Sequence, residues 1–503
     1  MSISLYSRLR AFPRSAGMSI ASALVLRLAA QGSVFIAIIL LGRLLGPEDF
    51  GRYAFLFGVM TFLSLFNVAG INDVLVREMA ASPQDREVTY RNGMGLKLVC
   101  GMGSVVLALA LLSFFPLVDL PWWAGALGAL TLLFSFSTGS YRTIWEAPYQ
   151  VDFRMGVFAL VNFTAKALFL IFLVLWTLVK LRITPVEFLH LAEGALVGGA
   201  AAAVVLQIAA EALGTGLQGA FNVKYGYSLK PCWNPAIIRR LLKEVWPLAL
   251  SGGLMMALAK VNLAFIRLML PARDMGLYAA PMRLVEALYI LPTVFVAGVL
   301  PVLSTDWINS REKFKRSSQI GLKILMTAAL PVAVVVNLYS SEVMGLFGPG
   351  YSDSAPVMAA FVWLTPLGFS AIFLHAALVA AGGVRTLTAV YFIQAVAALG
   401  LNLLFIRWWG APGAAWAQVA AYGVMFPAML AFPVSRHLGK VWFKITLPAA
   451  AAALVCALIV HRLNVGLGAA VIITPTLFLI AAYLMGWIRK RDWEEGMKLL
   501  REK

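Results

Sequence analysis

The sequence predicts an all-α integral membrane protein. Of its 503 residues, 61% are hydrophobic and 13% are charged, whereas a soluble chain has roughly half its residues apolar and a quarter charged. Apolar stretches of about 18 residues or more recur along the whole chain, and each is long enough to cross a hydrocarbon core of about 30 Å. They show sustained apolarity with Gly and Ala, rather than the alternation that a lipid-facing barrel strand needs.

The first apolar stretch is predicted to be a permanent span. Three arginines between residues 8 and 14 precede it, as in a secretory signal. A signal has a shorter apolar region of about 7 to 15 residues that ends at a small-residue cleavage site. Here the stretch continues past Arg27 and Gln31 to Leu41.

Apolar runs predict fourteen spans, followed by a short basic tail. The runs cover approximately residues 16–42, 50–73, 93–115, 121–141, 155–178, 190–218, 245–270, 275–303, 320–344, 355–381, 387–408, 413–434, 443–462 and 467–488.

Basic residues predict the orientation of these spans. If the N-terminus is cytoplasmic, 29 of the 41 lysines and arginines fall in cytoplasmic segments, Lys97 and Arg142 among them, and 7 fall in external ones. Such a bias in short loops fixes topology, so both termini are expected in the cytoplasm and the protein in the inner membrane. The net charge of +18 then gathers on one membrane face near anionic lipid, and no nucleic-acid partner is expected.

A charged hairpin occurs twice in the sequence. Pro47, Asp49 and Gly51 lie between the first two spans, and Asp274 and Gly276 occupy the same register between spans seven and eight. Both copies contain the pattern D-x-G-x-Y-A, and 225 residues separate the two aspartates. Any hairpin favours Gly, Pro and Asp, which is the alternative explanation, but Tyr and Ala are not turn residues.

The offset of six spans leaves both hairpins in one orientation, which describes a parallel repeat with a substrate site between two halves. The predicted domains are an N-lobe with spans 1 to 6 at residues 1–218, a C-lobe with spans 7 to 12 at 219–435, and a final helix pair with a basic cytoplasmic tail at 436–503.

Four segments in order, LLGRLLGPEDFGRYAF with VLVREMA, YAAPMRLVEALYILPTVFVAGVLPVLS, LFGPGYSDSAPVM and GAPGAAWAQVAAYG, resemble the Wzx-type polysaccharide flippases of the multidrug/oligosaccharidyl-lipid/polysaccharide superfamily. The resemblance spans nearly the whole chain. It implies two six-helix lobes in a V around a central cavity, and alternating access that moves polyprenyl-diphosphate-linked oligosaccharide to the outer leaflet. The expected partners are this substrate, membrane lipids and other polysaccharide assembly proteins.

Independently of the resemblance, five basic residues fall inside predicted spans: Arg27, Lys166, Lys260, Arg267 and Arg283. A cation at the bilayer centre costs roughly 2.5 to 3.5 kcal/mol, so five that faced lipid would cost on the order of 10 to 17 kcal/mol. Most of them must therefore face an interior. Arg267 is four residues from Pro271 and has the alternative of reaching the outer interface.

Polar neighbours at helical spacing accompany these cations. Gln31 follows Arg27 by four residues, Asn162 precedes Lys166 by four, and Glu286 follows Arg283 by three. One interpretation is a cationic, water-filled cavity for the diphosphate and sugar hydroxyls. The other is interhelical ion pairing, for which the available acids are Asp73, Glu193, Glu211 and Glu286.

Two other classes of function remain open at this stage. An integral membrane polymerase, ligase or glycosyltransferase needs acids, bases or metal ligands on a sizeable external loop, and the predicted external loops are short. A drug or cation antiporter of the same superfamily would suit an acidic interior rather than a basic one. Cys100, Cys232 and Cys456 are scattered, and we expect no catalytic residue, metal or cofactor.

Overall fold

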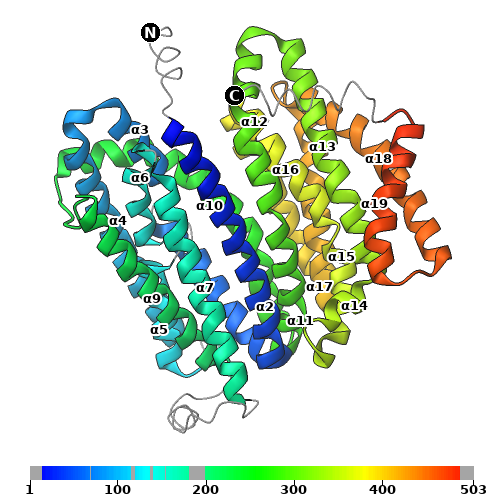
Figure 1. Cartoon of the computed structure of the whole chain (residues 1–503), viewed down its shortest axis with the longest axis horizontal. Helices are drawn as coiled ribbons and strands as arrows, with labels where there is room; N and C mark the ends of the chain where they lie inside the picture. The colour runs from blue at the N-terminus through cyan, green and yellow to red at the C-terminus, as the bar shows by residue number, and fades with distance from the viewer. Residues whose placement is uncertain are drawn as a thin grey trace. The chain divides into compact units, whose positions relative to one another are not determined.

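The computed structural model describes residues 14–67, 70–114, 119–135, 140–152, 154–180 and 199–487, and it describes their side chains except those of 14–21, 247, 248 and 250–261. Within these ranges every regular element is a helix (Figure 1). The all-α prediction is confirmed.

The chain divides into two compact units, Met1–Lys260 and Val261–Lys503. The first contains α2 Arg14–Leu63, η1 Ser64–Asn67, α3 Ile71–Ala81, η2 Pro83–Asp85, α4 Arg86–Phe114, α5 Trp122–Phe134, η3 Tyr141–Glu146, α6 Ala147–Val151, α7 Met155–Lys180, α9 Ala200–Lys224 and most of α10 Pro235–Met269. The second contains α11 Ala272–Leu288, α12 Ile290–Asn309, α13 Arg311–Leu338, α14 Ser340–Gly345, η4 Pro349–Ser354, α15 Ala355–Phe361, α16 Leu364–Ala380, α17 Val384–Ala431, α18 Arg436–Leu463 and α19 Leu467–Leu484. The three predicted domains stay a prediction.

Nine helices in the described ranges are long and apolar enough to cross a membrane, or ten if η4 with α15 and α16, which are bent by 43°, form one span. Each of the fourteen predicted runs lies at least partly on a helix, but α2 and α17 each carry two runs. The multi-pass architecture is therefore clear, whereas the count of fourteen stays a prediction.

Glycine with proline breaks both of these long helices. Gly46 in α2 has φ 70° and is followed by Pro47, and Gly410 in α17 has φ 62° with Pro412 two residues later. A positive φ favours glycine, and proline has no N–H to donate to the preceding turn. The first break lies within the predicted hairpin. At the second hairpin Pro271 separates α10 from α11.

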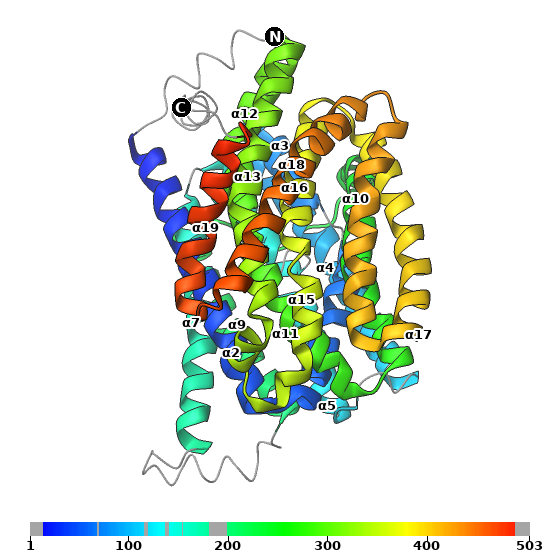
Figure 2. The same ribbon diagram turned by 90° about the vertical axis from the view of Figure 1, so that its right-hand side faces the viewer.

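Within each unit, long helices pack side by side. In the first unit α7 lies between α2 and α9, and α4 packs on α5 (Figure 1). In the second unit α13 is central, because it contacts α12, α16, α18 and α19 (Figure 2). The helix pair α18 and α19, which carries the last two predicted spans, thus packs on α13.

One predicted span, 121–141, does not form a single helix. The helix α5 has 13 residues, which gives a length of about 20 Å and is too short for a hydrocarbon core of about 30 Å. The chain resumes as the 3-10 turn η3, followed by the five-residue helix α6. A broken span of this kind exposes backbone groups that side chains must satisfy.

The close approach at Gly413 gives a test of the packing in α17. A Cβ there would collide with the backbone carbonyl of Phe405, whereas a Cβ at Gly423 on the same helix would meet nothing within 4 Å. We expect Gly413→Ala to destabilise the protein by about 1 to 3 kcal/mol because the backbone must shift. Gly423→Ala, the control, should be neutral or slightly stabilising because alanine favours helix.

Thermal unfolding of the two purified variants in detergent measures this difference. A midpoint for Gly413→Ala equal to that of Gly423→Ala would contradict the described packing.

Candidate functional site

The end of α5 lies among polar side chains from other helices of the first unit. Asn67, which is fully buried, donates its side-chain N–H to the Leu132 carbonyl at 2.8 Å. Thr215 of α9 donates its hydroxyl to the Phe134 carbonyl at 3.0 Å. The last carbonyls of a helix have no intrahelical partner, so these contacts satisfy groups that the break would leave exposed to an apolar interior.

Arg142 occupies the same break and is 1% exposed. Its Nε lies 3.4 Å from the Ser135 carbonyl, and its Nη1 donates to the side chain of Gln218 on α9. A guanidinium at the carboxyl end of a helix is favoured by the helix dipole. Arg142 therefore stabilises the end of α5 and brings positive charge into the first unit.

Lys97 of α4 adds a second buried cation, 2% exposed, and donates to the Thr143 hydroxyl at 2.6 Å. Lys97 and Arg142 were both counted in cytoplasmic segments, and in the structure both side chains are buried among helices. The available signal was the polar run SFSTGSYRT, Ser135–Thr143, within an apolar stretch. A span drawn through this run to residue 141 leaves Arg142 just outside.

Glu211 of α9, 4% exposed, joins this group to a predicted cation. Its Oε1 lies 3.9 Å from Nζ of Lys166 on α7, and it accepts hydrogen bonds from Ser135 at 3.2 Å and from Gln207 at 3.3 Å. The Lys166 side chain is 26% exposed. We call the connected set the polar cluster: Lys97, Ser135, Arg142, Thr143, Lys166, Glu211 and Gln218.

Arg27 pairs with an acid that sequence reasoning did not select. Its Nη2 lies 3.6 Å from Oε1 of Glu146, the last residue of η3, and the two side chains are 46% and 17% exposed. The neighbouring residues Gln31 and Asn162 are half-buried, and Asp73 on α3 is exposed. Of the predicted pairing acids in the first unit, Glu211 thus contacts a predicted cation.

The remaining predicted cations lie on α10 and α11. Arg283 forms a 3.2 Å ion pair with Glu286, as the ion-pairing alternative expects for these two residues. Arg267 on α10 is half-buried. The side chain of Lys260, and the whole of Glu193, lie outside the described residues.

The two units repeat one hydrogen bond. Tyr53 donates its hydroxyl to the side-chain oxygen of Gln207 in the first unit. Tyr278 donates to Gln418 in the second unit at 2.7 Å. The two tyrosines belong to the repeated D-x-G-x-Y-A pattern, so the hairpin resemblance extends to a shared contact.

The sequence carries a signal for the glutamine side of this contact. QIAAE at 207–211 and QVAAY at 418–422 share their pattern. A glycine with positive φ, Gly199 or Gly410, stands eight residues before each glutamine.

The hairpin residues have local structural roles. Asp49 pairs with Arg52 at 2.9 Å and lies against the glycine that precedes α9, where the helix dipole favours a carboxylate. Asp274 lies in the first turn of α11. Gly51 and Gly276 are buried.

Comparison with known proteins gives one family and a consistent fold. A family profile described as "Polysaccharide biosynthesis protein" matches residues 17–307. The fold is similar to that of lipid II flippase MurJ in an inward closed conformation, with 13% identity, a TM-score of 0.63, and coverage of 94% of this chain and 99% of that chain. No curated protein sequence matches the chain.

Two transporters of the MOP superfamily share this fold. An inward-facing multidrug resistance MATE family transporter has 13% identity, a TM-score of 0.63, and coverage of 84% of this chain and 99% of that chain. A transporter from Pyrococcus furiosus, for which a reverse polarity of the binding pocket suggests a different function, has 12% identity, a TM-score of 0.52, and coverage of 84% and 95%.

The pairing of Lys166 with Glu211 predicts a rescue. Lys166→Ala should lower the amount of folded protein, because breaking a buried ion pair strands the other charge, at a cost of up to about 3 to 5 kcal/mol. Lys166→Ala with Glu211→Gln should restore the yield, since the stranded charge is then absent. Lys180→Ala, on the same helix and exposed, is the control.

Size-exclusion chromatography of the detergent-solubilised variants measures the folded yield. If the double variant yields no more folded protein than Lys166→Ala, the ion-pair account of Glu211 is wrong.

Proposed function

The chain belongs to the polysaccharide biosynthesis protein family, and from this premise we propose that it flips polyprenyl-diphosphate-linked oligosaccharide from the cytoplasmic to the outer leaflet for cell-surface polysaccharide assembly. Its family and fold make it a multi-pass membrane transporter of the multidrug/oligosaccharidyl-lipid/polysaccharide superfamily. The single observation that supports the substrate class is the excess of cations around the broken span.

That excess is directly countable in the first unit. Among the described residues, Arg27, Lys97, Arg142 and Lys166 are the cations around the broken span, and Glu146 and Glu211 are acids that pair with Arg27 and Lys166. Ionisable side chains inside membrane segments are costly and mark transport pathways. An anionic diphosphate gains from this arrangement, whereas a cationic drug is repelled.

The four cations divide by exposure into two roles. Lys97 and Arg142 are buried and bound to the break, so their positions are fixed and they are not reached directly by a ligand. Arg27 and Lys166 are partly exposed, so a ligand can reach them. The guanidinium of Arg27 suits two phosphate oxygens at once, and the ammonium of Lys166 acts as a point charge.

The ion pairs suit a transport cycle. Without substrate, Glu146 and Glu211 neutralise Arg27 and Lys166, which lowers the cost of holding these charges in an apolar protein. The arriving diphosphate replaces the carboxylates as the partner of the cations. When it leaves, the carboxylates pair again, so the two cations have a partner in both states, and Glu211 keeps its hydrogen bonds from Ser135 and Gln207 while the ligand is bound. In this proposal the cycle operates by alternating access through a cationic cavity.

The fold alone does not choose this substrate, because a MATE family transporter shares it with the same TM-score as MurJ. For the Pyrococcus furiosus transporter, a reversed pocket polarity suggests a different function. We infer by the same reasoning that the cation excess of the first unit favours an anionic substrate over the cations of a drug antiporter. A polymerase, ligase or glycosyltransferase would change the saccharide covalently. Recovery of the saccharide without covalent change after transport would therefore favour the flippase over these enzymes.

Transport by proteoliposomes tests the proposal. We expect the wild type to move a labelled polyprenyl-diphosphate-linked oligosaccharide between leaflets. Arg27→Gln should slow this about tenfold or more, because one charge-assisted hydrogen bond contributes roughly 1.5 to 3 kcal/mol. The control Arg462→Gln removes an exposed arginine from the last turn of α18 and should transport at the wild-type rate.

Accessibility of the labelled saccharide to an impermeant reagent measures the rate. Efflux of a cationic dye without saccharide movement would establish the antiporter instead. Wild-type transport by Arg27→Gln would exclude Arg27 from the substrate path.

A further inference from the structure

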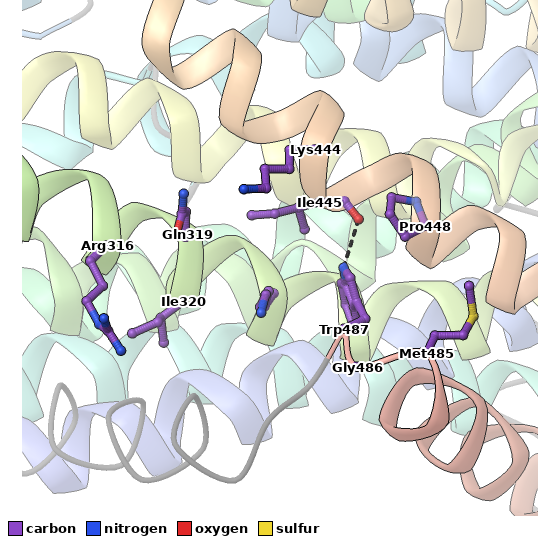
Figure 3. Close-up of a pocket in the computed structure, with 10 residues that line it drawn as sticks. Arg316, Gln319, Ile320, Lys444, Ile445, Pro448, Met485, Gly486 and Trp487 are labelled. Carbon is purple, nitrogen blue, oxygen red and sulfur yellow. Dashed lines mark hydrogen bonds between the residues drawn. The ribbon is translucent and has the colours of Figure 1, made fainter.

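A second polar site lies in the second unit and shares no residue with the polar cluster. It is a pocket of about 470 Å³ lined by residues of α13, α18 and the turn after α19 (Figure 3). Three of its lining residues are basic, Arg316, Lys323 and Lys444. The pocket therefore brings basic side chains from two helices together.

The pocket also has an apolar wall. Ile320, Ile445 and Trp487 line the same pocket. Trp487 is 7% exposed, and its indole N–H donates to the Ile445 carbonyl at 2.9 Å, the bond drawn in Figure 3. This bond fixes the turn after α19 against α18. The pocket thus presents cations beside a rigid apolar surface.

The position of the pocket along its helices matches a membrane interface. Arg316 lies in the second turn of α13, Lys444 in the third turn of α18, and Trp487 three residues beyond the end of α19. All three positions are near the same-side ends of long apolar helices, where headgroups meet acyl chains. Tryptophan and basic residues are enriched at this depth. The basic bias of the sequence assigns this side to the cytoplasm.

We propose that this pocket binds the phosphate headgroup of an anionic phospholipid, with an acyl chain against the apolar wall. The three cations match a phosphodiester, and basic pockets between membrane helices on the cytoplasmic side suit anionic headgroups. Inorganic phosphate is also an anion, but it has no acyl chain to contact the wall formed by Ile320, Ile445 and Trp487. The lipid is a bound component rather than cargo, and the proposal holds whatever the transported substrate is.

Lipid binding to the purified full-length protein tests this site. Phosphatidylglycerol and phosphatidylcholine are titrated separately into the detergent-solubilised protein, and native mass spectrometry measures the bound fraction. We expect phosphatidylglycerol to bind more tightly than phosphatidylcholine. The triple variant R316Q/K323Q/K444Q should lose on the order of 100-fold in affinity for phosphatidylglycerol.

The matched control removes the same charge from the same helices. K313Q/K315Q/K440Q changes two exposed lysines of α13 and one of α18 that do not line the pocket, and it should bind phosphatidylglycerol as the wild type does. Trp487→Phe removes the hydrogen bond to the Ile445 carbonyl. It should weaken the binding of phosphatidylglycerol and leave the binding of inorganic phosphate unchanged.

Each alternative outcome overturns the proposal. Equal losses in the triple variant and its control would show a diffuse charge effect rather than a site. Equal affinity for the two phospholipids would exclude recognition of anionic headgroups. Binding of millimolar inorganic phosphate to the wild type, with no additional binding of phosphatidylglycerol, would show that the pocket binds a free anion rather than a lipid.

Discussion

The cost of leaving backbone carbonyls without hydrogen-bond donors inside an apolar bundle shapes the first unit. Because α5 stops after 13 residues, its final carbonyls need donors, and Asn67, Thr215 and Arg142 supply them from outside the helix. Arg142 in turn donates a hydrogen bond to Gln218. The hydroxyl of Ser135, which follows α5, donates to Glu211, and Glu211 pairs with Lys166. One interrupted helix thus determines where several charged side chains are buried.

The same arrangement connects stability with function. Buried ion pairs contribute little net stability, yet removal of one partner is costly. A site in which carboxylates neutralise the cations until an anionic ligand replaces them therefore keeps its cations partnered in both states. Exposure decides which members a ligand can reach, and here Arg27 and Lys166 are the accessible ones. In the proposed function, structural and functional roles are compatible around the broken span, because a ligand exchanges with the carboxylates as the partner of the cations.

The sequence predicted the helices better than the site. Sustained apolarity located the long helices of the described residues, and the hairpin predicted at Pro47, Asp49 and Gly51 coincides with the break that the structure has at Gly46. The broken span was missed, because hydropathy averages over the polar run that precedes Arg142 and cannot show that the backbone leaves the helix there. Partner choice was also only partly predictable: Arg283 and Glu286 are close in sequence, whereas the pairing of Arg27 with Glu146 depends on how separate helices pack.

The central claim is that cations around the broken span hold a diphosphate, and the affinity of the purified protein for polyprenyl diphosphate tests it most directly. A polyprenol of equal length without phosphate is the reference, since it retains the apolar contacts alone. We predict tighter binding of the diphosphate, and a loss of about tenfold in Arg27→Gln, the equivalent of one charge-assisted hydrogen bond of roughly 1.5 kcal/mol. Equal affinity for the diphosphate and the alcohol, or an unchanged affinity for the diphosphate in Arg27→Gln, would contradict the account.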